Sequence, residues 1–117
     1  MHDQSFPKSR RLLKNAEYQK VYAQGHKKSF GGIVLHWLEV GEGQSTRFGL
    51  ALRRKIGNAV LRNRIKRRLR YLIRTCPQPF ARGYWVIITA ATRNCATEDI
   101  EAQKKYLYHA LEEIVRK

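Results

Sequence analysis

The chain has 117 residues, 43% of them hydrophobic, which fits a single folded domain with a modest core. No apolar run is long enough to cross a membrane, and the N-terminus lacks the apolar core of a signal peptide, so we expect a cytoplasmic protein. The net charge is +15, because 24 Lys and Arg residues face only 9 Asp and Glu residues. Such an excess indicates a polyanionic partner, and phosphate backbones are the most common one.

The N-terminal part of the chain is predicted to contain an arm and one short helix. Residues 1–14 are polar and basic and should form a partly ordered arm. Asn15 can cap a helix that ends at Gly25. Within this helix, Tyr18 and Tyr22 lie one turn apart, where they could serve as core aromatics or as a stacking platform for single-stranded bases.

Two β-type segments follow this helix. Residues 30–40 form a run of β-branched and aromatic residues that predicts one long strand. Residues 46–53 alternate, so that Phe48, Leu50 and Leu52 share one face. The opposite face is small and basic, and a groove could open above it.

The second half of the chain predicts a helix, a strand and a final helix. Asn58 can cap a helix that runs to about Thr75. Its apolar stripe consists of Leu61, Ile65, Leu69, Leu72 and Cys76. Residues 84–90 are typical of a buried strand, and Thr97 is placed to cap the last helix. The order of helix, two or three strands, helix, strand and helix favours an α+β fold with a mixed sheet covered by helices.

The basic helix carries the strongest functional signal. Residues 53–74 contain ten Arg or Lys residues, and no acidic residue occurs between Gly43 and Thr97. Solvated helix faces usually mix Glu with Lys, because opposite charges one turn apart stabilise a helix. Here Arg predominates over Lys, and Arg favours bidentate contacts with phosphate. The pattern therefore favours nucleic-acid binding over a merely solvated face.

Two further residue types in the chain allow more than one interpretation. Asn63 stands between two arginines and could contact a base edge or a 2′-hydroxyl, or be exposed without a role. Cys76 and Cys95 form no CxxC pair. We interpret them as small hydrophobic residues in a reducing compartment, with a disulfide or a metal site as the alternative.

A catalytic group is not evident in the sequence. The acidic residues lie outside the basic segment and the four His residues are scattered, so neither a carboxylate cluster nor a histidine pair stands out. His36 falls in a predicted strand and fits a lining residue better than a catalyst. Folding can bring distant residues together, so the pattern argues against an autonomous enzyme but leaves that alternative open.

The run 55–70, which centres on an Arg-Asn-Arg triplet, resembles the signature helix of the bacterial ribonuclease P protein component. The similarity covers nearly the whole chain. Residues 11–25 resemble the first helix of the family, residues 48–51 the strand before the signature, and residues 84–88 the strand after it.

This resemblance implies a definite fold. It implies a single RNA-binding domain over residues 1–117, with a mixed four-stranded sheet and the αβββαβα order of the ribosomal protein S5 domain 2-like fold. A parallel β-α-β unit is normally right-handed. The family is a left-handed exception, so we expect a left-handed crossover here.

The resemblance also implies a function. The family member is the protein subunit of a ribonucleoprotein endonuclease that removes the 5′ leader from precursor tRNA. The catalytic RNA and its Mg²⁺ ions perform the cleavage, so no catalytic residue, metal or cofactor is expected in the protein. Its partners would be the ribonuclease P RNA subunit and precursor tRNA, without a membrane or DNA partner.

The site residues implied by the resemblance fall into two groups. Those expected to contact the RNA subunit are Arg53, Lys55, Arg62, Asn63, Arg64, Lys66, Arg67, Arg68 and Arg70. Those expected to line a cleft for the leader are Tyr18, Tyr22, Val34, His36 and Ala51. The family usually has Phe at positions 18 and 22, and Tyr keeps the ring while adding a hydroxyl.

Three other functions are compatible with the composition. A structural RNA-binding protein of ribosomal type would fail to restore leader removal by the catalytic RNA. A DNA-binding regulator that uses the basic helix for recognition would prefer duplex DNA to structured RNA in competition. A self-sufficient ribonuclease would cleave precursor tRNA without any RNA subunit.

Overall fold

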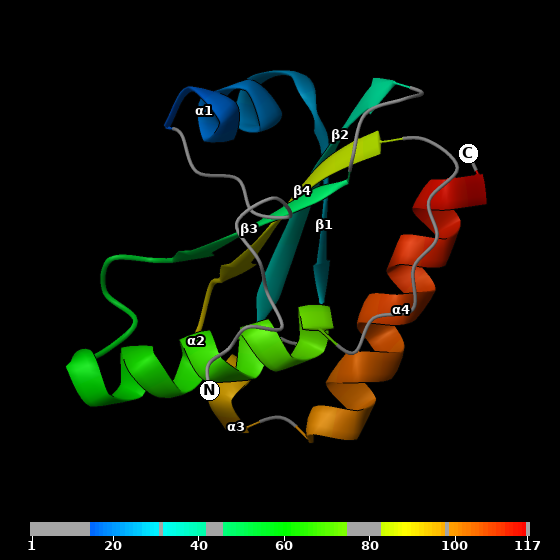
Figure 1. The fold of residues 1–117 in the computed structure, drawn as a ribbon. Coiled ribbons are helices and arrows are strands. Elements are labelled where there is room, and N and C mark those ends of the chain that lie inside the picture. Colours follow the sequence, from blue (N-terminus) through cyan, green and yellow to red (C-terminus); the bar gives the residue numbers. More distant parts are fainter. Residues whose placement is uncertain (1–14, 31, 42–45, 75–82, 98, 117) are drawn as a thin grey trace.

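The fold is built on a four-stranded sheet with helices on both of its faces (Figure 1). The computed structural model describes residues 15–30, 32–41, 46–74, 83–97 and 99–116. In chain order, the elements are α1 (Asn15–Gln24), β1 (His26–Phe30), β2 (Ile33–Gly41), β3 (Arg47–Leu52), α2 (Ala59–Arg74), β4 (Gly83–Ala90), α3 (Asn94–Thr97) and α4 (Ile100–Arg116).

The sheet is mixed, as predicted. Its strands lie in the order β1-β2-β4-β3. The pairs β1–β2 and β2–β4 are antiparallel, whereas β3 and β4 are parallel and are connected through α2. The structure therefore confirms the predicted α+β class and the αβββαβα order, to which it adds only the short α3.

Helix α1 ends where the sequence predicted. The N–H of Gly25 donates to the carbonyl of Val21 at 2.8 Å. A Cβ atom on Gly25 would lie 2.3 Å from the carbonyl oxygen of Trp37, so a larger residue cannot occupy this close approach between α1 and β2. The predicted arm, residues 1–14, lies outside the described residues.

The strand predicted for residues 30–40 forms as β2, but its start was misplaced, because a β-hairpin turn precedes Ile33. One strand ends at Phe30 and the next begins at Ile33. Gly32 adopts a φ of 79°, which lies in the left-handed region that favours glycine. The first strand escaped prediction because its residues before Phe30 are polar and exposed at the edge of the sheet.

Helix α2 forms as predicted. The Asn58 side chain caps it, since Oδ1 accepts a hydrogen bond from the N–H of Leu61 at 3.0 Å. The described part of the predicted stripe packs inward, and the residues that it buries fully are Ile65, Leu69 and Leu72. Ile73 is also buried, which the stripe did not include, and Cys76 lies outside the described residues.

The predicted cap of the last helix is wrong. Thr97 belongs to α3, and α4 begins three residues later. Asp99 is the capping residue, because its Oδ2 accepts a hydrogen bond from the N–H of Ala102 at 3.2 Å. The additional turn of α3 shifts the helix start. Leu107 and Leu111 of α4 are buried, as predicted.

The two faces of the sheet differ in how well they are covered. On one face a large core packs against α2 and α4, and it includes Phe48 together with Leu50 and Leu52, as the alternation predicted. On the other face only Val21 of α1 and Ile87 of β4 are fully buried in the described residues. Figure 1 shows the corresponding arrangement, with α1 at the top and α2 and α4 at the bottom and right.

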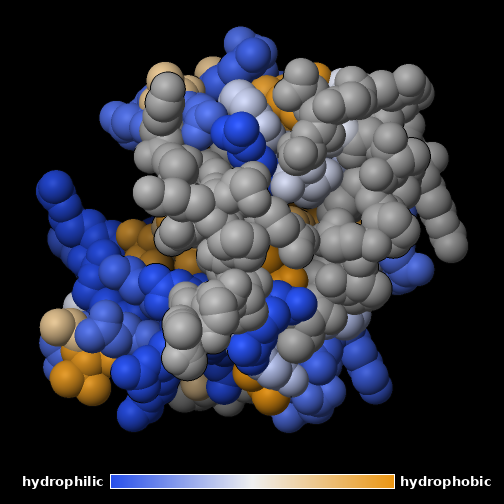
Figure 2. Space-filling view, in the orientation of Figure 1, coloured by the Kyte–Doolittle hydropathy of each residue, from blue (hydrophilic) through white to orange (hydrophobic). Residues whose placement is uncertain are grey.

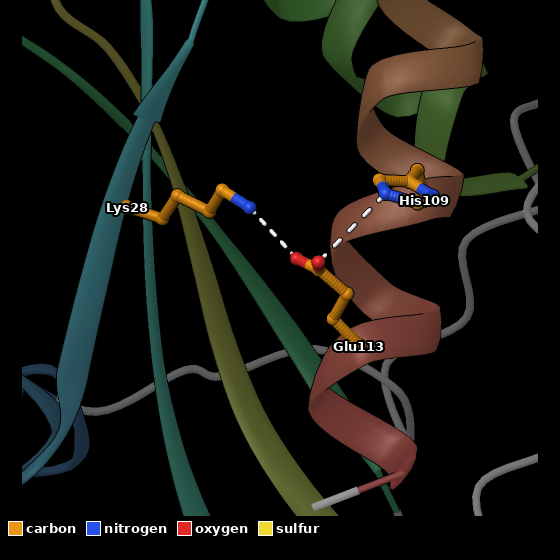
Figure 3. A network of polar contacts seen from close by, with 3 residues as sticks. All are labelled: Lys28, His109 and Glu113. Carbon is orange, nitrogen blue, oxygen red and sulfur yellow. Dashed lines mark hydrogen bonds and ion pairs between the residues drawn. The ribbon is translucent and has the colours of Figure 1, made fainter.

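An exposed polar network connects the hairpin with α4 (Figure 3). Lys28 Nζ lies 2.7 Å from Glu113 Oε1, and His109 Nε2 lies 3.7 Å from Glu113 Oε2. Because the Lys28 and Glu113 side chains are both about half exposed, solvent screens this pair and it stabilises the fold only slightly. Among the described residues, no helix has the length and apolarity that a membrane span requires.

Candidate nucleic-acid interface

The outer face of α2 presents a row of cationic side chains. Asn63, Arg64, Arg67 and Arg70 are exposed and Lys66 is half-buried, and we call these five residues the α2 basic face. Figure 2 shows hydrophilic side chains gathered at the lower left, where Figure 1 places α2. The sequence of α2 contains no acidic residue, so nothing within the helix cancels this positive potential.

A basic loop leads into α2 and extends its charged surface. Arg53, Arg54 and Lys55 are all exposed in this loop. The half-buried Arg62 holds it, because Nη1 donates to the carbonyl oxygens of Arg53 at 3.2 Å and Arg54 at 3.4 Å. One predicted RNA contact, Arg62, therefore also shapes the loop that carries two others.

Arg93 fixes the same loop from the other side. Its Nε donates to the carbonyl oxygen of Ile56 at 3.1 Å, and the Ile56 side chain is buried. The N–H of Arg53 donates to the carbonyl of Ala90 at 3.0 Å. The sequence prediction included neither Arg54 nor Arg93. No sequence signal identifies Arg93, because its partner lies 37 residues away in the chain.

Arg68 lies differently from the other predicted contacts. It is half-buried, and its guanidinium donates to the Oε1 atom of Gln103 at 2.9 Å and to the carbonyl oxygen of Ala96 at 3.1 Å. Both acceptors belong to the C-terminal part of the fold, so Arg68 connects α2 with α3 and α4.

The residues predicted to line a leader cleft meet on the other face of the sheet. In the strand register, Val34 pairs with Thr89, and Thr89 pairs with Ala51. His36 lies two residues along β2 from Val34 and points to the same face. Tyr18 packs near Ala51 on this face. The structure therefore brings the five predicted cleft residues together where α1 meets the sheet.

Tyr22 and His36 form an aromatic pair in this region. Their ring centroids are 4.9 Å apart with an interplanar angle of 86°, and Tyr22 is 42% exposed. Burial, and secondarily the charge of Lys27, lowers the pKa of His36 below its ordinary value. The imidazole is therefore neutral at neutral pH and can both donate and accept a hydrogen bond.

Tyr18 has a different environment from Tyr22. It is half-buried, and its hydroxyl donates a long hydrogen bond of 3.4 Å to the carbonyl of Leu50. A Cβ atom on Gly49 would lie 2.6 Å from this hydroxyl, so the glycine leaves the space that Tyr18 occupies. Burial raises the pKa of Tyr18. Tyr18 thus packs on β3, whereas Tyr22 offers an accessible ring.

Two buried polar atoms in this region have no hydrogen-bond partner among the described residues. They are Nδ1 of His36 and Oγ1 of Thr89. Buried polar atoms are normally paired with protein or water, so these two are exceptions among the described side chains. Thr89 was absent from the sequence prediction, although its pairing with both Val34 and Ala51 follows from the register.

Polar contacts hold α1 over the sheet. Glu17 Oε2 lies 3.0 Å from Arg47 Nη1, and the Glu17 side chain is largely buried. Lys20 Nζ lies 5.8 Å from the centre of the Trp85 ring, within range of a cation–π contact. Since Val21 is the only fully buried residue of α1, these contacts help to fix the position of the helix.

The described residues contain no group of three or more His, Cys, Asp or Glu side chains that could hold a metal ion. Cys95 is a buried free cysteine, as interpreted from the sequence, and burial raises the pKa of its thiol. Cys76 lies outside the described residues. His36 contacts Tyr22 and His109 faces Glu113, so these two histidines belong to separate parts of the fold.

Most of the sequence matches a known protein family. The model of the ribonuclease P family, described as "Ribonuclease P", matches residues 6–115. The chain belongs to the ribonuclease P protein component family. It is 41% identical over 83 residues to the member from Symbiobacterium thermophilum, which covers 71% of this chain and 72% of that protein. It is 38% identical over 102 residues to the member from Bacillus cereus, which covers 87% of this chain and 88% of that protein.

Solved structures of family members show the same fold. A mutant of the Staphylococcus aureus RNase P protein superposes with a TM-score of 0.75 and 27% identity, covering 92% of this chain and 89% of that chain. The RNase P protein from Thermotoga maritima gives a TM-score of 0.71 at 20% identity, covering 88% of this chain and 96% of that chain. Membership of this family implies an RNA partner in a ribonucleoprotein.

Proposed function

We propose that this protein is the subunit of a cytoplasmic ribonuclease P that binds the catalytic RNA and the 5′ leader of precursor tRNA. The α2 basic face and the basic loop would bind the RNA subunit. The cleft under α1 would bind the single-stranded leader. The observation that carries the proposal is the presence of these two distinct surfaces in one small fold that belongs to the ribonuclease P protein family.

The chemistry of the α2 basic face supports contact with folded RNA. Guanidinium groups match phosphate oxygens in bidentate pairs, and Asn63 adds an amide that can donate to and accept from a 2′-hydroxyl. The loop is held by Arg62 and Arg93 through its carbonyl groups, so the backbone that carries its three cations would be ordered before RNA arrives. Order before binding reduces the entropy lost when the complex forms. Arg62 and Lys66, both half-buried, are included in the proposed contacts.

The chemistry of the cleft supports contact with single-stranded RNA. The accessible Tyr22 ring offers a stacking surface that every base can use. His36 would add a polar ring beside Tyr22, while Val34 and Ala51 would supply a small apolar floor. Tyr18 would act mainly by holding α1 over β3, since its hydroxyl approaches Leu50 and Gly49.

The two surfaces adjoin at the end of β3. Ala51 lies on the cleft side of this strand, and the basic loop begins at Arg53, directly after β3. A precursor whose body is held by the catalytic RNA could therefore pass its leader from the α2 side into the cleft. This layout gives the protein a way to raise the affinity for precursor over mature tRNA.

In this proposal the protein supplies binding and charge, while the catalytic RNA and the Mg²⁺ that it holds supply the bond cleavage. Cationic side chains reduce phosphate repulsion as the substrate approaches the RNA subunit. The same screening favours cation binding by the RNA, so the protein should matter most when Mg²⁺ is scarce.

Reconstitution with the catalytic RNA tests the proposal. Leader removal from precursor tRNA is measured at low and high Mg²⁺ with the RNA alone, the protein alone and both together. We expect cleavage at low Mg²⁺ only when both are present. Cleavage by the protein alone, or an RNA subunit whose activity does not respond to the protein, would contradict it. The second result would instead favour a structural RNA-binding protein of ribosomal type.

A further inference from the structure

Arg68 is surrounded by cationic residues in the sequence but is engaged inside the fold. Nη1 lies 2.9 Å from Oε1 of Gln103 in α4, and Nη2 lies 3.1 Å from the carbonyl oxygen of Ala96 in α3. The two nitrogens thus contact two different elements. Such forked, charge-assisted hydrogen bonds are stronger and more directional than neutral ones.

The partner of Arg68 is itself fixed. Gln103 is only 1% exposed, and its Nε2 donates to the carbonyl oxygen of Cys95 at 3.0 Å. Both ends of the Gln103 amide are therefore used, one by Arg68 and one by the backbone of α3. We call this network of Arg68, Gln103 and the carbonyls of Cys95 and Ala96 the Arg68 clasp.

The neighbours of Arg68 on α2 behave differently. Arg64, one turn earlier, and Arg67, the residue immediately before Arg68, are exposed, whereas Arg68 is half-buried. An apolar stripe fixes which side of a helix faces the core, but it tolerates small rotations because hydrophobic contacts are not directional. A hydrogen-bonded fork restricts such rotations, so the clasp can determine where the exposed arginines point.

We propose that Arg68 is a positioning residue that sets the orientation of α2 relative to α3 and α4, and that it does not itself contact RNA. The family resemblance places it among the RNA contacts, so this inference differs from that expectation. Through the clasp, Arg68 would keep the exposed arginines in the arrangement that folded RNA requires. The part of this inference that concerns RNA rests on the proposed function, whereas the clasp itself does not.

The test compares three variants of the full chain: Arg68→Met, Gln103→Leu and the control Arg67→Met. Affinity for transcribed ribonuclease P RNA is measured over a range of salt concentrations, at a temperature where each variant is folded. Arg68→Met and Gln103→Leu should each weaken binding about three- to tenfold without changing the salt slope, because neither removes a phosphate contact. Arg67→Met should reduce the slope by about one unit.

Gln103→Leu is the decisive variant, because it removes the side-chain partner of Arg68 without removing a charge, and the side chain of Gln103 is itself buried. A salt slope that falls by about one unit in Arg68→Met would overturn the inference, since it would show a phosphate contact. Unchanged affinity in both clasp variants would overturn the positioning role and leave Arg68 as a purely structural residue. If Arg67→Met also left the slope unchanged, the proposed RNA surface would fail separately from the clasp.

A double-variant cycle tests the clasp if a single variant folds poorly. Unfolding equilibria are measured for Arg68→Met, Gln103→Leu and the double variant. Each single change leaves a polar group of the other residue without its partner, whereas the double variant removes both partners. The unfolding constant of the double variant should therefore be about tenfold smaller than the product of the two single effects predicts. Purely multiplicative losses would show that the two side chains are not coupled and would overturn the clasp. The salt slope can then be measured on the double variant.

Discussion

The two faces of the sheet differ in charge and in how firmly they are packed. On the α2 side, exposed arginines sit on a helix whose underside is anchored by a large core. On the α1 side, a helix with one fully buried residue covers aromatic and polar groups of the sheet. The α2 side is therefore rigid and highly charged, while the α1 side is thinly packed and mixed in character. Under the proposed function, charge would serve the larger, folded RNA partner, and aromatic and polar contacts would serve a single strand.

The largest expected effect comes from removing the charge of the α2 basic face. The triple variant Arg64→Met, Arg67→Met and Arg70→Met should bind the catalytic RNA about 100-fold more weakly, with a salt slope smaller by about three units. Binding to the RNA subunit as a function of salt concentration measures both quantities. Lys105→Met removes an exposed cation on α4 and should change neither one appreciably. If Lys105→Met weakened RNA binding as much per removed charge as the triple variant does, net charge alone would drive binding.

A second, smaller effect is expected on the α1 side. Tyr22→Ala removes the accessible ring and should weaken precursor tRNA binding by the holoenzyme by about 1–3 kcal/mol, the range for base stacking. Mature tRNA, which lacks the leader, should bind as before. Tyr106→Ala is the matched control, because Tyr106 is a 58% exposed tyrosine on α4. Equal losses for precursor and mature tRNA would remove Tyr22 from the cleft.

The environment of His36 gives the α1 side a pH dependence. Burial, followed by the charge of Lys27, lowers the pKa of His36 from the ordinary value of 6.5. The unfolded chain therefore takes up a proton at a higher pH than the folded protein does, and the folded state loses stability as the pH falls below about 6.5. The His36→Phe variant lacks this titrating group. The free energy of unfolding of the wild-type protein should therefore fall relative to that of His36→Phe as the pH is lowered below about 6.5. Denaturant unfolding between about pH 7.5 and 5 measures this, and a constant difference would contradict it.

The smallest expected effect concerns the ion pair that holds α1. Glu17→Gln should lower the free energy of unfolding by about 0.2–1 kcal/mol, because Arg47 is 40% exposed and solvent weakens the attraction. Added salt should reduce the difference from the wild-type protein. Arg47→Met provides the control, since combining it with Glu17→Gln should add little further loss. Full additivity of the two losses would show that the pair does not act as a unit.

Local patterns were sufficient to predict most of the elements. The charged helix was predictable because its apolar stripe, which includes Leu69 and Leu72, and its capping residue, Asn58, lie within one segment. The first hairpin strand was missed because its polar residues occupy a sheet edge and carry no alternation. The start of the last helix was misplaced because both Thr97 and Asp99 are good caps, and only the extra turn of α3 decides between them.

The candidate site was only partly predictable for a related reason. Exposed arginines were identified from the lack of nearby acids, but the inward direction of Arg68 depends on Gln103, 35 residues away. Thr89 lies between Val34 and Ala51 because of the strand register, and Arg93 contacts the basic loop through the carbonyl of Ile56. Sequence patterns indicate which residues carry a given chemistry, whereas tertiary partners decide which of them remain accessible.

The central claim is that the two faces act separately, and one measurement tests it most directly. The ratio of precursor to mature tRNA affinity is determined for fully assembled holoenzyme, with protein in excess, for the wild type, the triple arginine variant and Tyr22→Ala. We predict that the ratio stays at its wild-type value in the arginine variant and falls toward one in Tyr22→Ala. Equal loss of the ratio in both variants would contradict the division of roles between the two faces.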